Sequence, residues 1–118
     1  MAVQEAEGRT LVTSYGGMWW TSGSRPVAHL WGELDAANAA GVFAIIRQGV
    51  ERREVVIDLS DVVFMGSNVL GELLTLTKDA AVRVVAPQGS QPRRVLELTG
   101  LTATISTFGT VAAALDAR

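Results

Sequence analysis

The segment VVIDLSDVVFMGSNVLGELL (residues 55–74) decides the fold. Residues 54–60 are rich in β-branched side chains and do not alternate, which is typical of a central strand covered on both faces. Residues 69–81 repeat leucine every three or four positions, and this spacing predicts an amphipathic helix. A polar break at residues 66–68 separates the two. The order of strand, break and helix therefore predicts one unit of an α/β sheet.

Two strands and a helix are predicted upstream of this unit. RTLVTSY (9–15) alternates loosely and is interpreted as the first strand. GGMWWTSGSRP (16–26) is either a hairpin connection or a strand continuation followed by a turn. VAHLWGEL (27–34) alternates between apolar and polar faces and is the second strand. Residues 35–53 have helical spacing of apolar side chains, and Asp35 is expected to cap that helix.

Two more strand–helix pairs are predicted downstream. VRVVAP (82–87) is expected to form a short buried strand. Residues 92–101 begin at a proline and stop at a glycine, which is typical of a helix. Residues 102–108 are expected to form an edge strand, and residues 109–118 a last helix capped by Thr110.

The predicted order is β-β-α-β-α-β-α-β-α, and it indicates an α/β fold. Strands that alternate with helices favour a mixed, mostly parallel sheet flanked by helices, whereas the first β-β pair should be antiparallel. A chain of 118 residues suffices for one domain. We expect that domain to span residues 10–117, after a flexible N-terminus at residues 1–9.

Composition excludes several classes of protein. The chain contains no cysteine, so disulfides, thiolate metal sites and cysteine nucleophiles are excluded. The net charge of −2 argues against a nucleic-acid partner. No apolar run approaches the ~20 residues of a membrane span, and the first residues do not resemble a signal peptide. We therefore expect a cytoplasmic protein.

Catalytic candidates are scarce. His29, the only histidine, lies in an alternating strand, where a structural or solvent-facing role is favoured over that of a general base. The acidic residues show no spacing typical of an acid–base pair or a metal cage. We expect no enzymatic activity, no metal and no cofactor. The aromatic stretch at 16–20 is interpreted either as buried under the sheet edge or as a surface for a partner.

The polar break is the strongest candidate site. The carboxyl ends of parallel strands meet the helix N-termini at one edge of a sheet, where ligands and partners bind. Ser67 or Asn68 could cap the following helix, with Gly66 allowing an unusual backbone angle. Alternatively, a phosphate on Ser67 would lie at a helix N-terminus and add about −1.5 to −2 charge, which would disfavour a docked partner. Phe64 and Met65 either close the core or border this docking edge.

Three blocks of the sequence resemble the STAS domain of anti-sigma factor antagonists. They are GELDAANA (32–39), VVIDLSDVVFMGSNVLGELL (55–74) and VRVVAPQGSQPRRVLELTGL (82–101). The family pattern in the second block is an apolar strand, Asp-Leu-Ser, Phe-Met, then Asp-Ser-Ser-Gly-Leu. The resemblance implies a protein that binds an anti-sigma factor and so releases a sigma factor. It also implies that this partner is a serine kinase of the histidine-kinase-like ATPase fold, opposed by a phosphatase.

The resemblance also implies which residues form the site. The phosphorylated serine of the family corresponds to Ser67, and the acid of the GELD run, Asp35, would help to form the docking edge. Gly66, Asn68 and Leu70 complete the expected partner-binding set.

The chain departs from the family motif at three positions. Gly66 replaces the acid, Asn68 the second serine and Val69 the glycine. Because Val69 is β-branched, a left-handed backbone there would be costly, and the loop is expected to differ in shape. These departures leave a second function open. The chain would then be an unphosphorylated STAS accessory subunit of a transport system, or a ligand-sensing or scaffold module.

Overall fold

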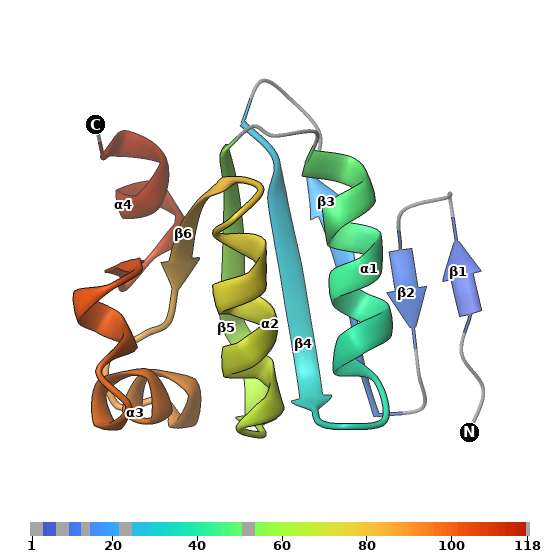
Figure 1. The fold of residues 1–118 in the computed structure, drawn as a ribbon, viewed down its shortest axis with the longest axis horizontal. Helices are drawn as coiled ribbons and strands as arrows, with labels where there is room; N and C mark the ends of the chain where they lie inside the picture. The colour runs from blue at the N-terminus through green and yellow to red at the C-terminus, as the bar shows by residue number, and fades with distance from the viewer. Residues whose placement is uncertain (1–3, 7–9, 13–14, 22–24, 51–53, 118) are drawn as a thin grey trace.

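The computed structural model describes residues 4–6, 10–12, 15–21, 25–50 and 54–117 (Figure 1). Within these residues, seven strands form one sheet in the order β1-β2-β3-β4-β5-β6-β7. Neighbours from β1 to β4 are antiparallel, and neighbours from β4 to β7 are parallel. The strands are β1 (Gln4–Ala6), β2 (Thr10–Val12), β3 (Gly16–Thr21), β4 (Val27–Leu34), β5 (Glu54–Met65), β6 (Ala81–Val85) and β7 (Ser106–Phe108).

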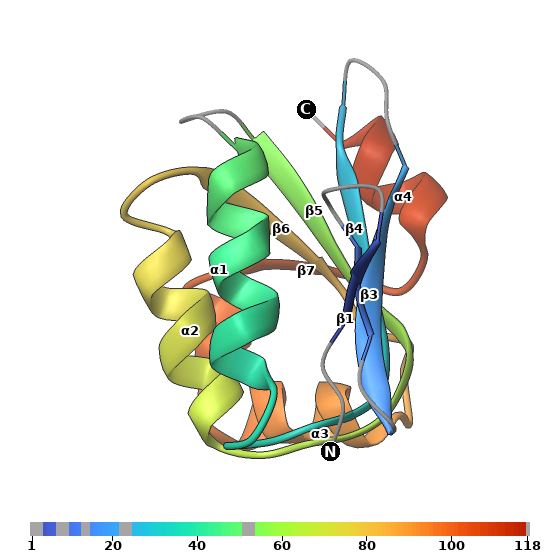
Figure 2. The ribbon, with the colours of Figure 1, turned by 90° about the vertical axis from the view of Figure 1, so that its right-hand side faces the viewer.

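Helices cover both faces of this sheet. Figure 2 shows α1 and α2 on one face and α4 on the other, while α3 lies across the lower edge. The helices are α1 (Ala39–Val50), α2 (Asn68–Leu76), α3 (Gln91–Leu98) and α4 (Val111–Asp116), with a 3-10 turn at Leu101–Ala103. From β3 onward, the order β-β-α-β-α-β-α-β-α and the mixed, mostly parallel sheet are as the sequence predicted.

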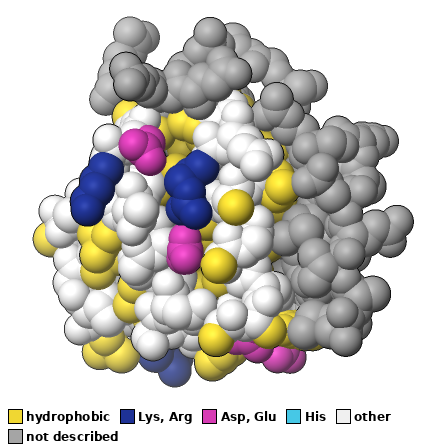
Figure 3. Space-filling view, turned by 45° about the vertical axis from the view of Figure 1, so that its right-hand side comes forward, with side chains coloured by type: hydrophobic (Ala, Val, Ile, Leu, Met, Phe, Trp, Pro, Cys, Tyr) yellow, Lys and Arg dark blue, Asp and Glu magenta, His cyan; other side chains and the backbone are white. Residues whose placement is uncertain are grey.

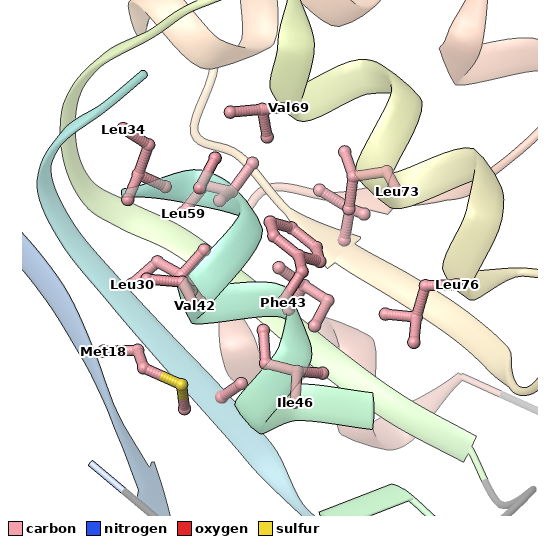
Figure 4. Close-up of a cluster of buried hydrophobic side chains, with 14 of the residues drawn as sticks. Met18, Leu30, Leu34, Val42, Phe43, Ile46, Leu59, Val69, Leu73 and Leu76 are labelled. Atoms are coloured by element: carbon pink, nitrogen blue, oxygen red, sulfur yellow. The ribbon is translucent and has the colours of Figure 1, made fainter. Parts of the chain in front are cut away.

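The main core lies between the sheet and the pair α1 and α2. Figure 4 shows Phe43 of α1 pointing toward Leu73 of α2, with Leu30 and Leu59 of the sheet on its other side. All four side chains are essentially inaccessible to solvent. Replacing a side chain such as Phe43 by alanine costs about 3–5 kcal/mol. A smaller cluster lies between the other face of the sheet and α4; it consists of Val27, Val56, Val85 and Ala114. The two clusters hold β4 and β5 from both faces.

The strand that pairs with β4 is residues 16–21, and not residues 9–15. Of the two interpretations of residues 16–26, the strand continuation is therefore the correct one for residues 16–21. The glycines at its start resemble a turn signal, but they serve close approach to β4. A Cβ on Gly16 would lie 2.3 Å from the carbonyl oxygen of Glu33, and its partner Gly32 has a φ of 75°. Residues 9–15 contribute the short β2, and Gln4–Ala6 form β1 where only a flexible segment was expected.

Two strands have other bounds than predicted: the strand expected over residues 54–60 continues to Met65, and the strand expected over 102–108 is limited to Ser106–Phe108, after the 3-10 turn. The helix predicted over residues 35–53 begins at Ala39, and residues 51–53 lie outside the described part of the chain. The helix predicted over 69–81 ends at Leu76 and continues as turns. Gly100 follows α3 with a left-handed φ of 80°. Thr110 caps α4 as predicted, since its side chain accepts a hydrogen bond from the Ala113 N–H.

Candidate functional site

The candidate site lies at the edge where the parallel strands end, at the bottom of Figure 1. There β4 leads through Asp35 into α1, and β5 leads through Gly66 and Ser67 into α2. The Gly66 N–H donates a hydrogen bond of 2.8 Å to the carbonyl oxygen of Leu34, which joins the ends of the two strands. The parallel topology thus brings Asp35, Gly66 and Ser67 to one edge, as the sequence predicted.

The last part of β5 differs from its first part. Pairing with β6 ends at Asp58, so residues 59–65 pair with β4 alone. Register shifts between β4 and β5 occur twice in this part, and each gives β5 one more residue than β4. Such bulges redirect side chains. As a result, Val63 and Phe64 are 73% and 46% exposed, whereas Met65 is buried.

This exposure decides between the two interpretations of Phe64 and Met65. Met65 closes the core, where it belongs to the main hydrophobic cluster. Phe64 does not, because the bulges turn it outward beside Glu33 of β4. Phe64 therefore borders the candidate docking edge together with Val63.

Ser67 does not cap α2, so that structural interpretation of the serine is wrong. It occupies the N-cap position, but its φ of −61° and ψ of −25° are helical and its side chain makes no capping hydrogen bond. A capping side chain needs an extended backbone to reach the free N–H groups of the first turn. Ser67 is also exposed. Its hydroxyl is consequently available to a visiting molecule.

Gly66 and Asn68 have different roles from those predicted. Gly66 is not among the glycines with positive φ, so it serves no unusual backbone angle. A Cβ at this position would instead lie 2.9 Å from the side-chain oxygen of Asn68. The glycine therefore leaves room for the Asn68 amide, which makes no capping bond of its own within the described residues.

Val69 and Leu70 anchor the helix that carries Ser67. Val69 is fully buried in the main core and lies within the right-handed helix α2. The cost of a left-handed backbone expected there therefore does not arise. Leu70 is half-buried and packs against the same core, so part of its side chain faces the edge. Hydrophobic burial thus holds α2 in place without any side-chain cap.

Asp35 organises the neighbouring loop. Its carboxylate accepts hydrogen bonds from the Ala37 N–H at 2.9 Å and from the Tyr15 hydroxyl at 3.1 Å. It thus caps the turn that precedes α1, and not the helix itself, which begins at Ala39. Desolvation raises the pKa of Tyr15 above its usual 10.0, and the hydrogen bond to Asp35 and the charges of Asp35 and Glu33 raise this pKa further.

Two amide side chains that the sequence analysis missed hold the strand ends. Asn38, which is 2% exposed, accepts from the Asp35 N–H at 2.9 Å and donates to the Glu33 carbonyl at 2.8 Å. Gln91 of α3 accepts from the Met65 N–H at 2.8 Å and donates to the Met65 carbonyl at 3.2 Å. Both residues lie within sequence blocks that resemble the STAS family, but the sequence gives no signal for these bonds, because both depend on the tertiary fold.

The face beside the site carries few charges. Figure 3 shows hydrophobic and uncharged side chains separating a small number of charged ones over α1 and α2. Arg47 and Glu72 pair across these two helices at 3.2 Å. Leu74 of α2 is 40% exposed. The exposed surface along α2 therefore carries few charges.

His29 lies on the opposite face of the sheet from α1. Its Nδ1 lies 2.7 Å from Asp58, whose other carboxylate oxygen accepts from the Ser60 hydroxyl at 2.6 Å. Trp19, which is 44% exposed, stacks on the His29 ring with a centroid distance of 3.9 Å. Trp20 instead packs partly against the main core. The aromatic stretch is thus divided between a buried and an exposed role.

The described residues contain no group of three or more His, Asp or Glu side chains that could hold a metal ion. Within the same part of the chain, no helix is long and apolar enough to cross a membrane.

Comparisons with solved structures agree with this architecture. The chain is similar to an anti-sigma factor antagonist from Mycobacterium paratuberculosis, with 26% identity and a TM-score of 0.67 over 83% of this chain and 89% of that one. The unphosphorylated anti-sigma factor antagonist SpoIIAA has 19% identity and a TM-score of 0.68, over 84% of this chain and 93% of that one. Phosphorylated SpoIIAA of Bacillus has 19% identity and a TM-score of 0.56, over 84% and 96%. At this identity the two SpoIIAA structures show the fold alone.

A search among curated proteins found no match. A family model for the STAS domain matches residues 21–114, which is most of the chain and includes every strand from β4 to β7. The family resemblance noted in the sequence is therefore confirmed, and the chain belongs to the STAS domain family.

Proposed function

We propose that the chain is an anti-sigma factor antagonist whose binding is switched off by phosphorylation of Ser67. One observation carries this proposal: Ser67 is exposed at the start of α2, and its hydroxyl makes no capping hydrogen bond. The similarity to the mycobacterial anti-sigma factor antagonist supports the same role. In this function the chain binds an anti-sigma factor, and the sigma factor that was held there is released.

The proposed docking surface consists of Asp35, Gly66, Ser67, Asn68 and Leu70. Phe64 and Val63 extend it on the side of β5, since both are exposed beside the same edge. The surface combines exposed apolar groups with few charges, which suits a closely packed protein contact. Binding here requires no covalent chemistry from this chain.

A phosphate on Ser67 would act on the bound state far more than on the free protein. The N–H groups at the start of α2 and the helix dipole tolerate negative charge in the free chain. In the complex, about −1.5 to −2 added charge would be desolvated beside the carboxylate loop of Asp35 and Glu33. The phosphorylated chain therefore dissociates from its partner.

We infer that the partner is the kinase itself, a serine kinase of the histidine-kinase-like ATPase fold, and that a phosphatase reverses the reaction. Gly66 occupies the position before the serine at which the family motif has an acidic residue. The Cα of Asp35 would lie 3.9 Å from a Cβ on Gly66, so Asp35 is a carboxylate residue beside the position of the missing acid. We propose that Asp35 supplies the negative charge that the motif acid supplies elsewhere in the family.

The experiment combines the purified chain, the cognate anti-sigma factor and radiolabelled ATP. Wild type should incorporate phosphate, and Ser67→Ala should not, while both bind the anti-sigma factor in a pull-down without ATP. Wild type that binds but takes up no phosphate would remove the switch and leave the binding role. Failure of the anti-sigma factor to be retained by either protein would remove both.

A second function keeps some support from the opposite face. The exposed Trp19, stacked on His29, gives that face an aromatic surface that the docking edge does not use. An accessory subunit of a transport system, or a ligand-sensing or scaffold module, would use such a surface without phosphorylation. Copurification of the chain with membrane ATPase components, and not with a kinase, would favour this alternative.

A further inference from the structure

The end of β5 lacks a strand partner on one side. β6 pairs with β5 only as far as Asp58, so the Met65 backbone has no strand neighbour in that direction among the residues that the structure describes. Unpaired backbone groups at a strand end exchange hydrogen bonds with water, and the chain there is free to move. Because Met65 precedes Gly66 and Ser67 directly, such movement would be passed to the serine.

The Gln91 side chain takes the place of the missing strand. Its amide oxygen accepts from the Met65 N–H and its amide nitrogen donates to the Met65 carbonyl, which is the bonding pattern of a neighbouring strand. On the other side, the Gly66 N–H is bound to the Leu34 carbonyl. The backbone is therefore held from both sides immediately before Ser67, whose own side chain makes no capping bond.

We propose that Gln91 is a positioning residue for Ser67, which presents the serine to the kinase by fixing the Met65 backbone. This inference rests on the proposed function for its effect on phosphorylation, but its structural part does not. Gln91 is also the first residue of α3.

The chain offers matched variants for a test. Gln91→Ala removes both bonds to Met65. Gln88→Ala is the control for residue type, since Gln88 is exposed and makes no hydrogen bond within the described residues. Ser90→Ala is the control for stability, because it removes the cap of α3 and leaves Met65 untouched.

Gln91→Glu separates positioning from helix stability. A glutamate in the first turn of a helix stabilises the helix. If Gln91 acted only by stabilising α3, Gln91→Glu should therefore be phosphorylated as fast as wild type. The glutamate carboxylate, however, has no N–H to donate to the Met65 carbonyl and would repel it. Positioning therefore predicts that Gln91→Glu behaves like Gln91→Ala.

The first measurement is amide hydrogen exchange, followed by NMR, and it needs no partner. We expect the Met65 amide to exchange about tenfold faster in Gln91→Ala. In Gln88→Ala the Met65 amide should exchange at the wild-type rate. In Ser90→Ala its exchange rate should rise no more than the lower global stability of that variant accounts for. A Met65 amide unaffected by Gln91→Ala would overturn the inference, whatever the function of the chain.

The second measurement is the rate of Ser67 phosphorylation by the cognate anti-sigma kinase. We expect kcat/KM to fall about tenfold to a hundredfold in Gln91→Ala and Gln91→Glu, and to stay near wild type in both controls. Wild-type rates in the Gln91 variants would overturn the positioning role. Absence of phosphorylation in the wild type would instead refute the proposed function, and the exchange result would still decide whether Gln91 holds the loop.

Discussion

A serine occupies the N-cap position of both α2 and α3, but only one of the two serines caps its helix. Ser90 has an extended backbone, with φ −74° and ψ 156°, and its hydroxyl oxygen accepts from the Arg93 N–H at 3.2 Å. The same hydroxyl donates to the Pro87 carbonyl at 2.7 Å. Ser67 has a helical backbone, with φ −61° and ψ −25°, and makes no capping bond. The local backbone, and not the residue type, decides whether a serine caps.

The difference indicates which hydroxyl group is not needed to stabilise the fold. Thr110 at the start of α4 behaves like Ser90, since it is extended and accepts from the Ala113 N–H. Ser67 is the exception among these three helix starts, and it follows Gly66, whose N–H binds the carbonyl at the end of β4. A cap contributes about 1 kcal/mol to stability. Ser67 does not contribute this stabilisation, and its hydroxyl group is therefore available for phosphorylation.

The largest expected effect concerns added charge at Ser67. Ser67→Asp should weaken binding to the anti-sigma factor about a hundredfold, because it places a desolvated carboxylate in the docking surface. Isothermal titration calorimetry with the purified partner measures this change. The control is Thr104→Asp, an exposed position just before β7 at the opposite ends of the parallel strands. Equal affinity of Ser67→Asp and wild type would place the docking surface elsewhere.

Removal of the two hydroxyls gives the next largest effect. Ser90→Ala should lower the free energy of unfolding by about 1 kcal/mol, because it removes a helix cap. Ser67→Ala should change it by less than about 0.5 kcal/mol, as expected for an exposed side chain without bonds. Urea unfolding of both variants measures the contrast. If Ser67→Ala lost as much stability as Ser90→Ala, Ser67 would be a cap in solution and the comparison would fail.

Restoring the family motif should have a smaller effect. Gly66→Asp alone adds a carboxylate near the start of α2, which is favourable, but its Cβ displaces the Asn68 amide. Asn68→Ser removes that conflict. In a double-mutant cycle, the two changes together should be about 0.5 kcal/mol more stable than the sum of the single changes. Strict additivity would show that Gly66 does not make room for Asn68.

Much of the fold was predictable because local patterns and burial agree. Residues 27–34 alternate, and β4 has those same bounds because one register alone buries Ala28 and Leu30. Thr110 was predictable as a cap because the residues that follow it continue as a helix. For residues 16–21 the sequence left a strand and a hairpin connection both open, because Gly16 lies against the Glu33 carbonyl, and nothing local distinguishes such close packing from a turn.

The site was predictable in its place and not in its details. Parallel strands followed by helices sufficed to bring Asp35 and Ser67 to one edge. The missing cap at Ser67, however, accompanies a backbone bond between Gly66, which follows β5, and Leu34 of β4. The bond between Gln91 and Met65 likewise joins residues 26 positions apart. Interactions of this kind leave no periodic signal in a sequence.

The smallest expected effect concerns Tyr15, which is bound to the loop beside Ser67. Desolvation and Asp35 raise the pKa of Tyr15 above 10.0, so the neutral phenol is favoured in the folded state. Its contribution to stability is therefore complete below pH 10.0 and is lost as the pH rises through the folded pKa. Because the chain has a single tyrosine, absorbance at alkaline pH reports this group alone.

Asp35→Asn should lower the Tyr15 pKa and leave it above 10.0, since it removes the negative charge of Asp35 and retains the desolvation. Unlike Ser67, Asp35 is already bound within its own loop, through the Ala37 N–H and the Tyr15 hydroxyl. Titration of the two proteins side by side measures the contribution of that carboxylate. An unchanged Tyr15 pKa would show that Asp35 turns away from Tyr15 in solution, and Asp35 would then be as free to meet a partner as the serine beside it.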